Sequence, residues 1–204
     1  MIAIINYGSG NVGAIAAIYK NLGIAHAIID DIDSLESADK YILPGVGNFD
    51  FTMGRIRHSG LSKLLDEQVT VHKKPLLGIC VGMQLLASSS EEGDVDGLGL
   101  IEGRVARISA KETRVRLPHM GWNSISVGHD PAGLFKNVDP ATGFYFLHNY
   151  HFIPVSSQSI MATAQYGEAL TCAVSNNENV FGTQFHPEKS HDNGIQLFKN
   201  FSEL

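Results

Sequence analysis

Pro75-Leu-Leu-Gly-Ile-Cys-Val-Gly-Met-Gln84 is the stretch of sequence that decides the fold. Residues 75–79 are apolar and predict a buried strand that ends at Cys80, and residues 83–87 predict a helix. Hydrolases present a serine nucleophile in this strand–turn–helix layout, and here a sulfur takes the place of the oxygen. Gly78 and Gly82 lie two residues to either side of Cys80, where a Cβ atom would collide with nearby backbone in so sharp a turn.

The sequence on both sides of this turn indicates the fold class. Before Cys80, predicted strands at residues 2–6, 25–30 and 40–43 alternate with predicted helices at 12–22 and 49–72, the latter broken at Ser59-Gly60. This alternation predicts an open, mostly parallel sheet flanked by helices. An acidic, glycine-rich loop at residues 88–99 separates the two halves. Further strands are predicted after it, at 104–108, 122–127, 143–152, 160–165, 170–175 and 180–184, and then a helix at 193–201. We therefore expect an α/β fold with antiparallel strand additions in its second half, with residues 1–204 forming one domain.

Composition excludes several classes of protein. The chain has 204 residues, of which 44% are hydrophobic and 18% charged, as in ordinary globular proteins. A net charge of −6 and the lack of a run of lysines and arginines argue against nucleic acid as a partner. Two cysteines do not make a disulfide framework, and no apolar run resembles a signal peptide or reaches the length of a membrane span. We expect a cytoplasmic protein with no membrane partner.

A cysteine nucleophile needs a base, and the sequence offers one candidate on local grounds. Pro187 forces His186 into an extended conformation, so that Glu188, two residues on, can lie beside the imidazole ring. The carboxylate would accept a hydrogen bond from Nδ1 and leave Nε2 free to serve the thiol. The competing interpretations are that Cys80 is an ordinary buried cysteine and that His186 belongs to a surface loop.

Two other patterns suggest different functions. Gly8-Ser-Gly-Asn-Val-Gly13 matches the dinucleotide-binding pattern and has Asp30 at a suitable distance, which makes a nicotinamide-dependent oxidoreductase a rival hypothesis. That hypothesis gives no role to Cys80 or His186. His148 and His151 suggest a metal site, but their spacing in one predicted strand places them on opposite faces, and we expect no metal and no cofactor.

Six motifs together carry a resemblance to a known family. Gly78-Ile-Cys-Val-Gly-Met-Gln84, Pro44-Gly-Val-Gly47 and Gln184-Phe-His-Pro-Glu-Lys-Ser190 resemble the triad (class I) glutamine amidotransferases. The motifs His119-Met-Gly-Trp-Asn123, Phe144-Tyr-Phe-Leu-His148 and Asn6-Tyr-Gly-Ser-Gly-Asn11 are similar to those of the glutaminase subunits of imidazole glycerol phosphate synthase, which acts in histidine biosynthesis. The resemblance runs from Met1 to the C-terminal helix.

The resemblance implies a role for each matching residue. Cys80 would attack the side-chain amide of glutamine, His186 would pass a proton to the departing ammonia, and Glu188 would orient His186. Backbone amides would hold the oxyanion, and further residues would bind glutamine or lie near a partner. By this similarity the oxyanion amides belong to Val46, Gly47 and Val81, the substrate contacts to Gln84, Glu92, His148, Asn149 and Tyr150, and the interface to Asn11, Trp122, Tyr145 and Lys189.

The resemblance also implies a partner. The ammonia would pass to a separate (β/α)8-barrel cyclase subunit in a heterodimer, because the glutaminase fold takes up nearly all of the 204 residues. Val81 and Asn149 depart from the usual family residues, leucine and serine or threonine, and are similar to a branch that supplies ammonia for amidination of a surface-polysaccharide sugar. That acceptor is the main alternative. A cysteine hydrolase acting on other amides is a third hypothesis.

Overall fold

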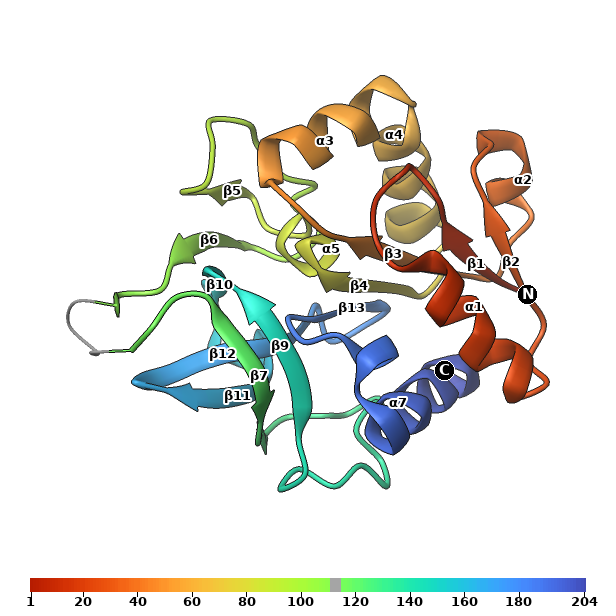
Figure 1. Ribbon diagram of the computed structural model, residues 1–204. Helices are drawn as coiled ribbons and strands as arrows, with labels where there is room; N and C mark the ends of the chain where they lie inside the picture. Colours follow the sequence, from red (N-terminus) through yellow and green to blue (C-terminus); the bar gives the residue numbers. More distant parts are fainter. Residues whose placement is uncertain (111–114) are drawn as a thin grey trace.

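The computed structural model describes residues 1–110 and 115–204, and its centre is one eight-stranded sheet in the order β2-β1-β3-β4-β13-β12-β11-β8 (Figure 1). Strands β2, β1, β3, β4 and β13 run parallel, and β12, β11 and β8 extend the sheet in antiparallel fashion. The predicted α/β fold with antiparallel additions is confirmed. The strands of this sheet are β1 (Ile2–Ile5), β2 (His26–Ile29), β3 (Lys40–Gly45), β4 (Leu76–Cys80), β8 (Ser126–Val127), β11 (Ile160–Tyr166), β12 (Glu168–Ser175) and β13 (Val180–Thr183).

Helices cover both faces of the parallel part, which explains why β1 and β4 are apolar and buried throughout. On one face α1 (Val12–Asn21) packs against α7 (His191–Glu203), and α3 (Phe49–His58) and α4 (Leu61–Leu65) lie on the other (Figure 1). The predicted break at Ser59-Gly60 is confirmed, because Gly60 adopts a left-handed conformation with φ of 80° between α3 and α4.

Some helical segments were not predicted from the sequence. The short helix α2 (Ile32–Glu36) follows β2, and its signal was the cap residue Asp31, whose carboxylate accepts a hydrogen bond from the Ser34 amide at 2.7 Å. Two 3-10 turns were not predicted either: η2 (Ser157–Ser159) precedes β11, and η3 (Pro187–Lys189) lies between β13 and α7. The π-helical segment η1 (Asp66–Val71) continues α4 and falls within the helical range predicted at 49–72.

Two small sheets lie beside the main one, and their strands show that the bounds of two predicted strands were wrong. β10 (Tyr150–Pro154), β6 (Gly103–Arg107) and β5 (Ser89–Ser90) form one, and β7 (His119–Asn123) pairs with β9 (Phe144–His148) in the other. The predicted strand 143–152 is therefore two strands divided at Asn149, and 122–127 is divided between β7 and β8. Hydrophobic alternation continues across both divisions, so it does not reveal that the chain changes its pairing partner.

The helix after Cys80 is also displaced from its predicted position. α5 (Val81–Gln84) begins two residues earlier than predicted and ends before residues 85–87. The carbonyl groups of Leu85, Leu86 and Ala87 accept hydrogen bonds from amides of the loop at residues 98–101 instead. These bonds compete with the continuation of the helix and tie the acidic loop to the turn that carries Cys80.

Candidate active site

Cys80 occupies a strained turn between β4 and α5. Its backbone φ is 56° and its ψ is −112°, a conformation that residues other than glycine rarely adopt. An added Cβ on Gly78 would lie 2.6 Å from the Gly82 carbonyl oxygen, and one on Gly82 would overlap the carbonyl oxygen of Leu43. Both glycines are therefore needed for close backbone approach, as the sequence predicted.

The topology of the sheet places His186 in the same pocket as Cys80. Cys80 ends β4, and His186 follows β13, the parallel neighbour of β4. Because the carboxyl ends of parallel strands meet at one edge of a sheet, the two side chains come together there. Both line one pocket, and the interaction with Cys80 contributes to the raised pKa of His186.

Glu188 lies beside His186, though in a different local structure from the predicted one. Its Oε1 is 2.8 Å from Nδ1 of His186, and both side chains are less than 5% exposed. The extended conformation ends at His186, and Pro187 begins the 3-10 turn η3, in which the Lys189 amide donates to the His186 carbonyl. The turn therefore brings the carboxylate to the ring in place of the predicted two-residue repeat of a strand.

Electrostatics at this pair favour a charged imidazole. Burial lowers the pKa of His186, but the hydrogen bonds to Cys80 and Glu188 and the negative charges of both groups outweigh it and raise this pKa well above its usual value. A carboxylate on Nδ1 leaves Nε2 directed at the sulfur. The arrangement can hold a thiolate beside an imidazolium that is ready to release its proton.

The pocket at Cys80 collects all of the predicted substrate residues. Its volume is about 200 Å³, below the roughly 300–1,000 Å³ typical of sites for drug-sized ligands, so it suits a small molecule. The predicted contacts that line it are Gln84, Glu92, His148, Asn149 and Tyr150.

Glu92 is held in this pocket by the start of α3. Its Oε2 accepts a hydrogen bond from the Phe49 amide at 2.8 Å. Burial raises the pKa of its carboxyl group, and the Phe49 amide partly offsets that rise. A partly buried carboxylate at the rim of a small pocket is a suitable partner for a ligand amino group.

A chain of buried imidazoles supports the other wall. Nδ1 of His148 lies 2.7 Å from the Tyr150 carbonyl oxygen, which can only accept, so this nitrogen carries the proton. Nε2 of His148 must then accept from Nδ1 of His119 at 2.8 Å, and Nε2 of His119 accepts from the Asn123 amide at 3.1 Å. Both rings are neutral in this chain, and together they fix the backbone around Asn149.

This neutral chain predicts a loss of stability in mild acid. Burial lowers the pKa of His119 to about 4 and that of His148 to about 3, from 6.5 for an ordinary histidine. The unfolded chain therefore binds more protons than the folded one between pH 6.5 and 4, so this contribution to stability is complete above pH 6.5 and falls below it. The raised pKa of His186 acts in the opposite sense, since its contribution is lost only in alkali.

We expect the free energy of unfolding, measured with urea, to fall by about 2 kcal/mol between pH 7 and pH 5. In a His119→Gln variant the fall should be smaller by about 1 kcal/mol, because one of the histidines with a lowered pKa is gone. His72→Gln, at an exposed histidine, is the matched control and should follow the native protein. Equal falls in the native and His119→Gln proteins would contradict a neutral buried chain.

The predicted oxyanion turn also lies at the pocket, but one of its amides has a partner. Val46, Gly47 and Val81 all line the pocket, and Gly47 has a φ of 106°. The Val46 amide donates to Ser9 Oγ at 3.0 Å, and Ser9 Oγ donates to the Val46 carbonyl at 2.8 Å. An oxyanion contact from the Val46 amide requires this bond to Ser9 to open.

Close packing accounts for the glycine motif near the N-terminus. An added Cβ on Gly10 would lie 2.6 Å from Cβ of Pro44, and one on Gly8 would overlap the guanidinium of Arg55. Ser9 is bonded to Val46 on the same side. The loop therefore packs against the protein's own chain where a dinucleotide site needs an open cradle, and the oxidoreductase hypothesis loses its support.

The two histidines that suggested a metal site lie in different sheets. His148 ends β9, whereas His151 lies in β10, in a different sheet. Within residues 1–110 and 115–204, no three His, Cys, Asp or Glu side chains are grouped so that they could hold a metal ion. No helix in the described part of the chain is long and apolar enough to cross a membrane.

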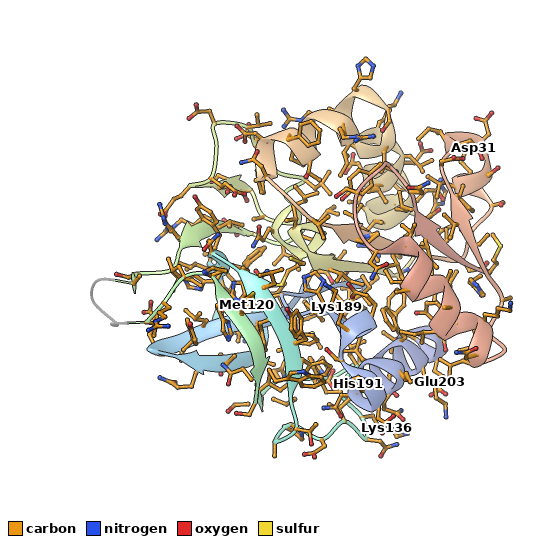
Figure 2. The ribbon with its side chains drawn as sticks, in the orientation of Figure 1. Asp31, Met120, Lys136, Lys189, His191 and Glu203 are labelled. Carbon is orange, nitrogen blue, oxygen red and sulfur yellow. The ribbon has the colours of Figure 1, made fainter. Side chains whose placement is uncertain are left out.

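Three of the four predicted interface residues lie together next to the pocket. Trp122 on β7 is opposite Tyr145 on β9, and Nζ of Lys189 lies 5.5 Å from the centre of the Tyr145 ring. Figure 2 shows Lys189 beside β9, with Met120 on the neighbouring β7. Asn11 lies apart from them along the chain, exposed just before α1.

Three residues near the pocket were not singled out from the sequence. Gln184 contacts the Cys80 sulfur, His119 supports His148, and Ser9 binds Val46. A two-residue repeat could have found Gln184, because side chains at 184 and 186 emerge on the same side of the chain beyond β13. The roles of His119 and Ser9 depend on contacts between distant segments, so no local sequence pattern indicates them.

Comparison with known proteins agrees with this geometry. The family model "Glutamine amidotransferase class-I" matches residues 3–203. The chain belongs to the class-I glutamine amidotransferase family. Among solved structures, one described as a glutamine amidotransferase aligns over 100% of this chain and 99% of its own with a TM-score of 0.74, at 20% identity, and so shares the fold.

Curated relatives are more similar in sequence. The protein named imidazole glycerol phosphate synthase subunit HisH from Bdellovibrio bacteriovorus is 47% identical over 207 residues, and the one of the same name from Leptospira borgpetersenii is 44% identical over 206. Each alignment covers 100% of both chains. A relative from Pseudomonas aeruginosa, named subunit HisH 2, is 43% identical over the full length of both.

Proposed function

We propose that residues 1–204 form one glutaminase domain that hydrolyses glutamine to glutamate and ammonia and supplies the ammonia to a separate synthase subunit. The observation that carries the proposal is the arrangement of Cys80, His186 and Glu188 in one small pocket. It is supported by the family of the chain and by relatives of the same length that are named as synthase subunits.

In the first step the Cys80 thiolate attacks the carbonyl carbon of the glutamine side-chain amide. A carbon–sulfur bond forms, and the negative charge moves to the carbonyl oxygen, where the Val81 amide and the Val46–Gly47 turn would bind it. The carbon–nitrogen bond then breaks as His186 gives its Nε2 proton to the departing nitrogen. The products are ammonia and a γ-glutamyl thioester on Cys80.

In the second step water replaces ammonia. Neutral His186 takes a proton from water as the oxygen attacks the thioester carbon, and the carbon–sulfur bond breaks to give glutamate and the thiolate. Glu188 accepts a hydrogen bond from the Nδ1–H group of His186 throughout and stabilises the imidazolium each time it forms. No cofactor takes part in either step.

The pocket supports a free amino acid as the substrate. Glu92 would bind the α-amino group, and Gln84 with the backbone at His148, Asn149 and Tyr150 would bind the remaining polar groups. A volume of about 200 Å³ leaves little room for the flanking residues of a peptide, which disfavours the hypothesis of a hydrolase acting on peptide amides.

An apolar strip on the outward face of β7 and β9 supports a protein partner. Met120 is 61% exposed, Trp122 45% and Leu147 38%, and Tyr145 completes the strip. Leu147 also lines the pocket, so the strip continues to the site where ammonia would be released. Exposed Trp, Tyr and Met side chains are enriched at protein interfaces. A (β/α)8-barrel cyclase of histidine biosynthesis, seated here, would complete a heterodimer and receive ammonia before it is protonated in water.

The alternative acceptor is a surface-polysaccharide sugar that undergoes amidination. The observation that favours it is Asn149, which lines the pocket between the two strands that the family resemblance places at the substrate. Because the glutaminase chemistry is the same, only the partner distinguishes the two acceptors.

We expect the isolated chain to release glutamate slowly and to accelerate by about tenfold or more when its synthase subunit and that subunit's ligand are added. The measurement is glutamate release with the barrel cyclase and, separately, with the sugar-modifying synthase of the same organism. A Trp122→Ala variant should lose most of the acceleration, and Val155→Ala, at an exposed residue outside the strip, should keep it. Equal turnover with and without either partner would rule the proposal out.

A further inference from the structure

Gln184 has a fully buried side-chain amide that contacts the sulfur atom of Cys80. It follows β13, shows 0% exposure, and its Nε2 lies 3.8 Å from Sγ of Cys80. The amide is therefore within hydrogen-bonding distance of the reacting sulfur atom. The roles proposed above for the triad, the oxyanion amides and the substrate contacts leave this side chain unused.

The surrounding network fixes which end of the Gln184 amide faces the sulfur. The Tyr150 carbonyl oxygen can only accept, so the atom of Gln84 that lies 3.2 Å from it is Nε2, a donor. The same Nε2 lies 3.0 Å from Gln184, which must therefore present its Oε1 there. The remaining end of Gln184, its NH₂ group, is left to point at Cys80.

The two contacts of the Cys80 sulfur suit different protonation states. The Leu147 carbonyl oxygen, 4.0 Å from Sγ, can accept a hydrogen bond from the neutral thiol. The Gln184 amide can donate to a thiolate, and it does not change charge with pH. Hydrogen bonds from a neutral donor to an ionised acceptor are about twice as strong as those between neutral groups. Of the two contacts, only the one to Gln184 can strengthen when the sulfur carries a negative charge during attack.

We propose that Gln184 is a second hydrogen-bond donor to the Cys80 thiolate, besides His186, and that it stabilises and orients the sulfur for attack. This inference rests on the proposed nucleophilic role of Cys80. Gln84 then acts on both sides, since it faces the substrate pocket and also holds the Gln184 amide in its donating orientation.

Titratable groups surround Cys80 from every neighbouring element. Tyr7, after β1, and His186, with Glu188 behind it, interact with the sulfur electrostatically or through hydrogen bonds. His148, Glu92 and Lys189 lie on the pocket wall. All of these groups are retained in Gln184→Met, which adds no charge, so a change in sulfur reactivity in that variant is assigned to the loss of the amide.

The test is the rate of Cys80 alkylation by iodoacetamide as a function of pH, with each cysteine followed by peptide mass spectrometry. Gln184→Met removes both the donor and the acceptor, and Gln184→Glu keeps an oxygen for Gln84 but loses the N–H toward sulfur. We expect the midpoint pH of Cys80 alkylation to rise by about one unit in Gln184→Met and at least as much in Gln184→Glu. Gln158→Met, at an exposed glutamine, is the control and should match the native protein.

Cys172 reports whether each variant is folded, because this cysteine is 1% exposed. We expect it to react with iodoacetamide only after unfolding. Gln184→Glu also adds a negative charge beside the sulfur, so Gln184→Met is the deciding variant. An unchanged midpoint in folded Gln184→Met would overturn the inference. Glutamate release by the native protein is measured separately, so that a failure of the glutaminase proposal is recognised independently of the alkylation result.

Discussion

Replacing Cys80 with alanine is expected to lower glutamate release by at least about 10⁴-fold, as the loss of a nucleophile does in other enzymes with such triads. The sulfur is the atom that forms the thioester, and no other side chain in the pocket can replace it. The fold should persist, because the substituted side chain is small and alanine is no more strained than cysteine at a φ of 56°. Glutamate production by the complex with its synthase partner is the measurement.

The matched control is Cys172→Ala, the same change at the other cysteine. Cys172 is buried in β12, and burial raises the pKa of its thiol, so it has neither the access nor the ionisation of a nucleophile. Its activity should stay within about threefold of native, apart from a modest loss of stability. Glutamate release that survives in folded Cys80→Ala would show that another group performs the chemistry.

Gly82→Ala should be the most damaging small substitution for the fold. The new methyl group would overlap the carbonyl oxygen of Leu43, a backbone atom in the middle of the central sheet that cannot move aside. Relief would require α5 to move away from β3 and would displace Cys80. We expect the free energy of unfolding, measured with urea, to fall by more than about 3 kcal/mol, at the upper end for overpacked sites.

Gly54→Ala is the control for this prediction. Gly54 lies inside α3 with open space around it and with no positive φ, so alanine should stabilise the helix by up to about 1 kcal/mol. The same methyl group therefore has opposite effects at the two positions. Similar stabilities for Gly82→Ala and the native protein would mean that the turn at Cys80 is looser than its geometry indicates.

Much of the fold and of the site follows from short-range patterns. The turn at Cys80 was predictable because only glycine allows backbone segments to approach so closely. Gly78 and Gly82 lie within two residues of Cys80, so the local sequence alone indicates the turn. The pairing of His186 with Glu188 was predictable because Pro187 keeps His186 extended, although the 3-10 turn that brings the carboxylate to the ring was not predicted. The parallel topology then places both at one edge of the sheet.

Other features depend on pairing between distant segments and leave no local trace. The division at Asn149 arises because β9 pairs with β7 whereas β10 pairs with β6. The support of His148 by His119 requires the register of β7 against β9, in which these two residues lie opposite each other. The bond between Ser9 and Val46 likewise joins two loops 37 residues apart and shows that a glycine-rich turn need not present its amides to a ligand.

The proposed mechanism depends most on a covalent bond between Cys80 and the side-chain carbonyl carbon of glutamine. A chloroketone analogue of glutamine, added to the native protein and followed by peptide mass spectrometry, measures the reactivity of this sulfur directly. We expect one label per chain, on the peptide that contains Cys80, formed in step with the loss of glutamate release and slowed by glutamine. Loss of activity with the label on another residue, or full activity with Cys80 completely labelled, would contradict the mechanism.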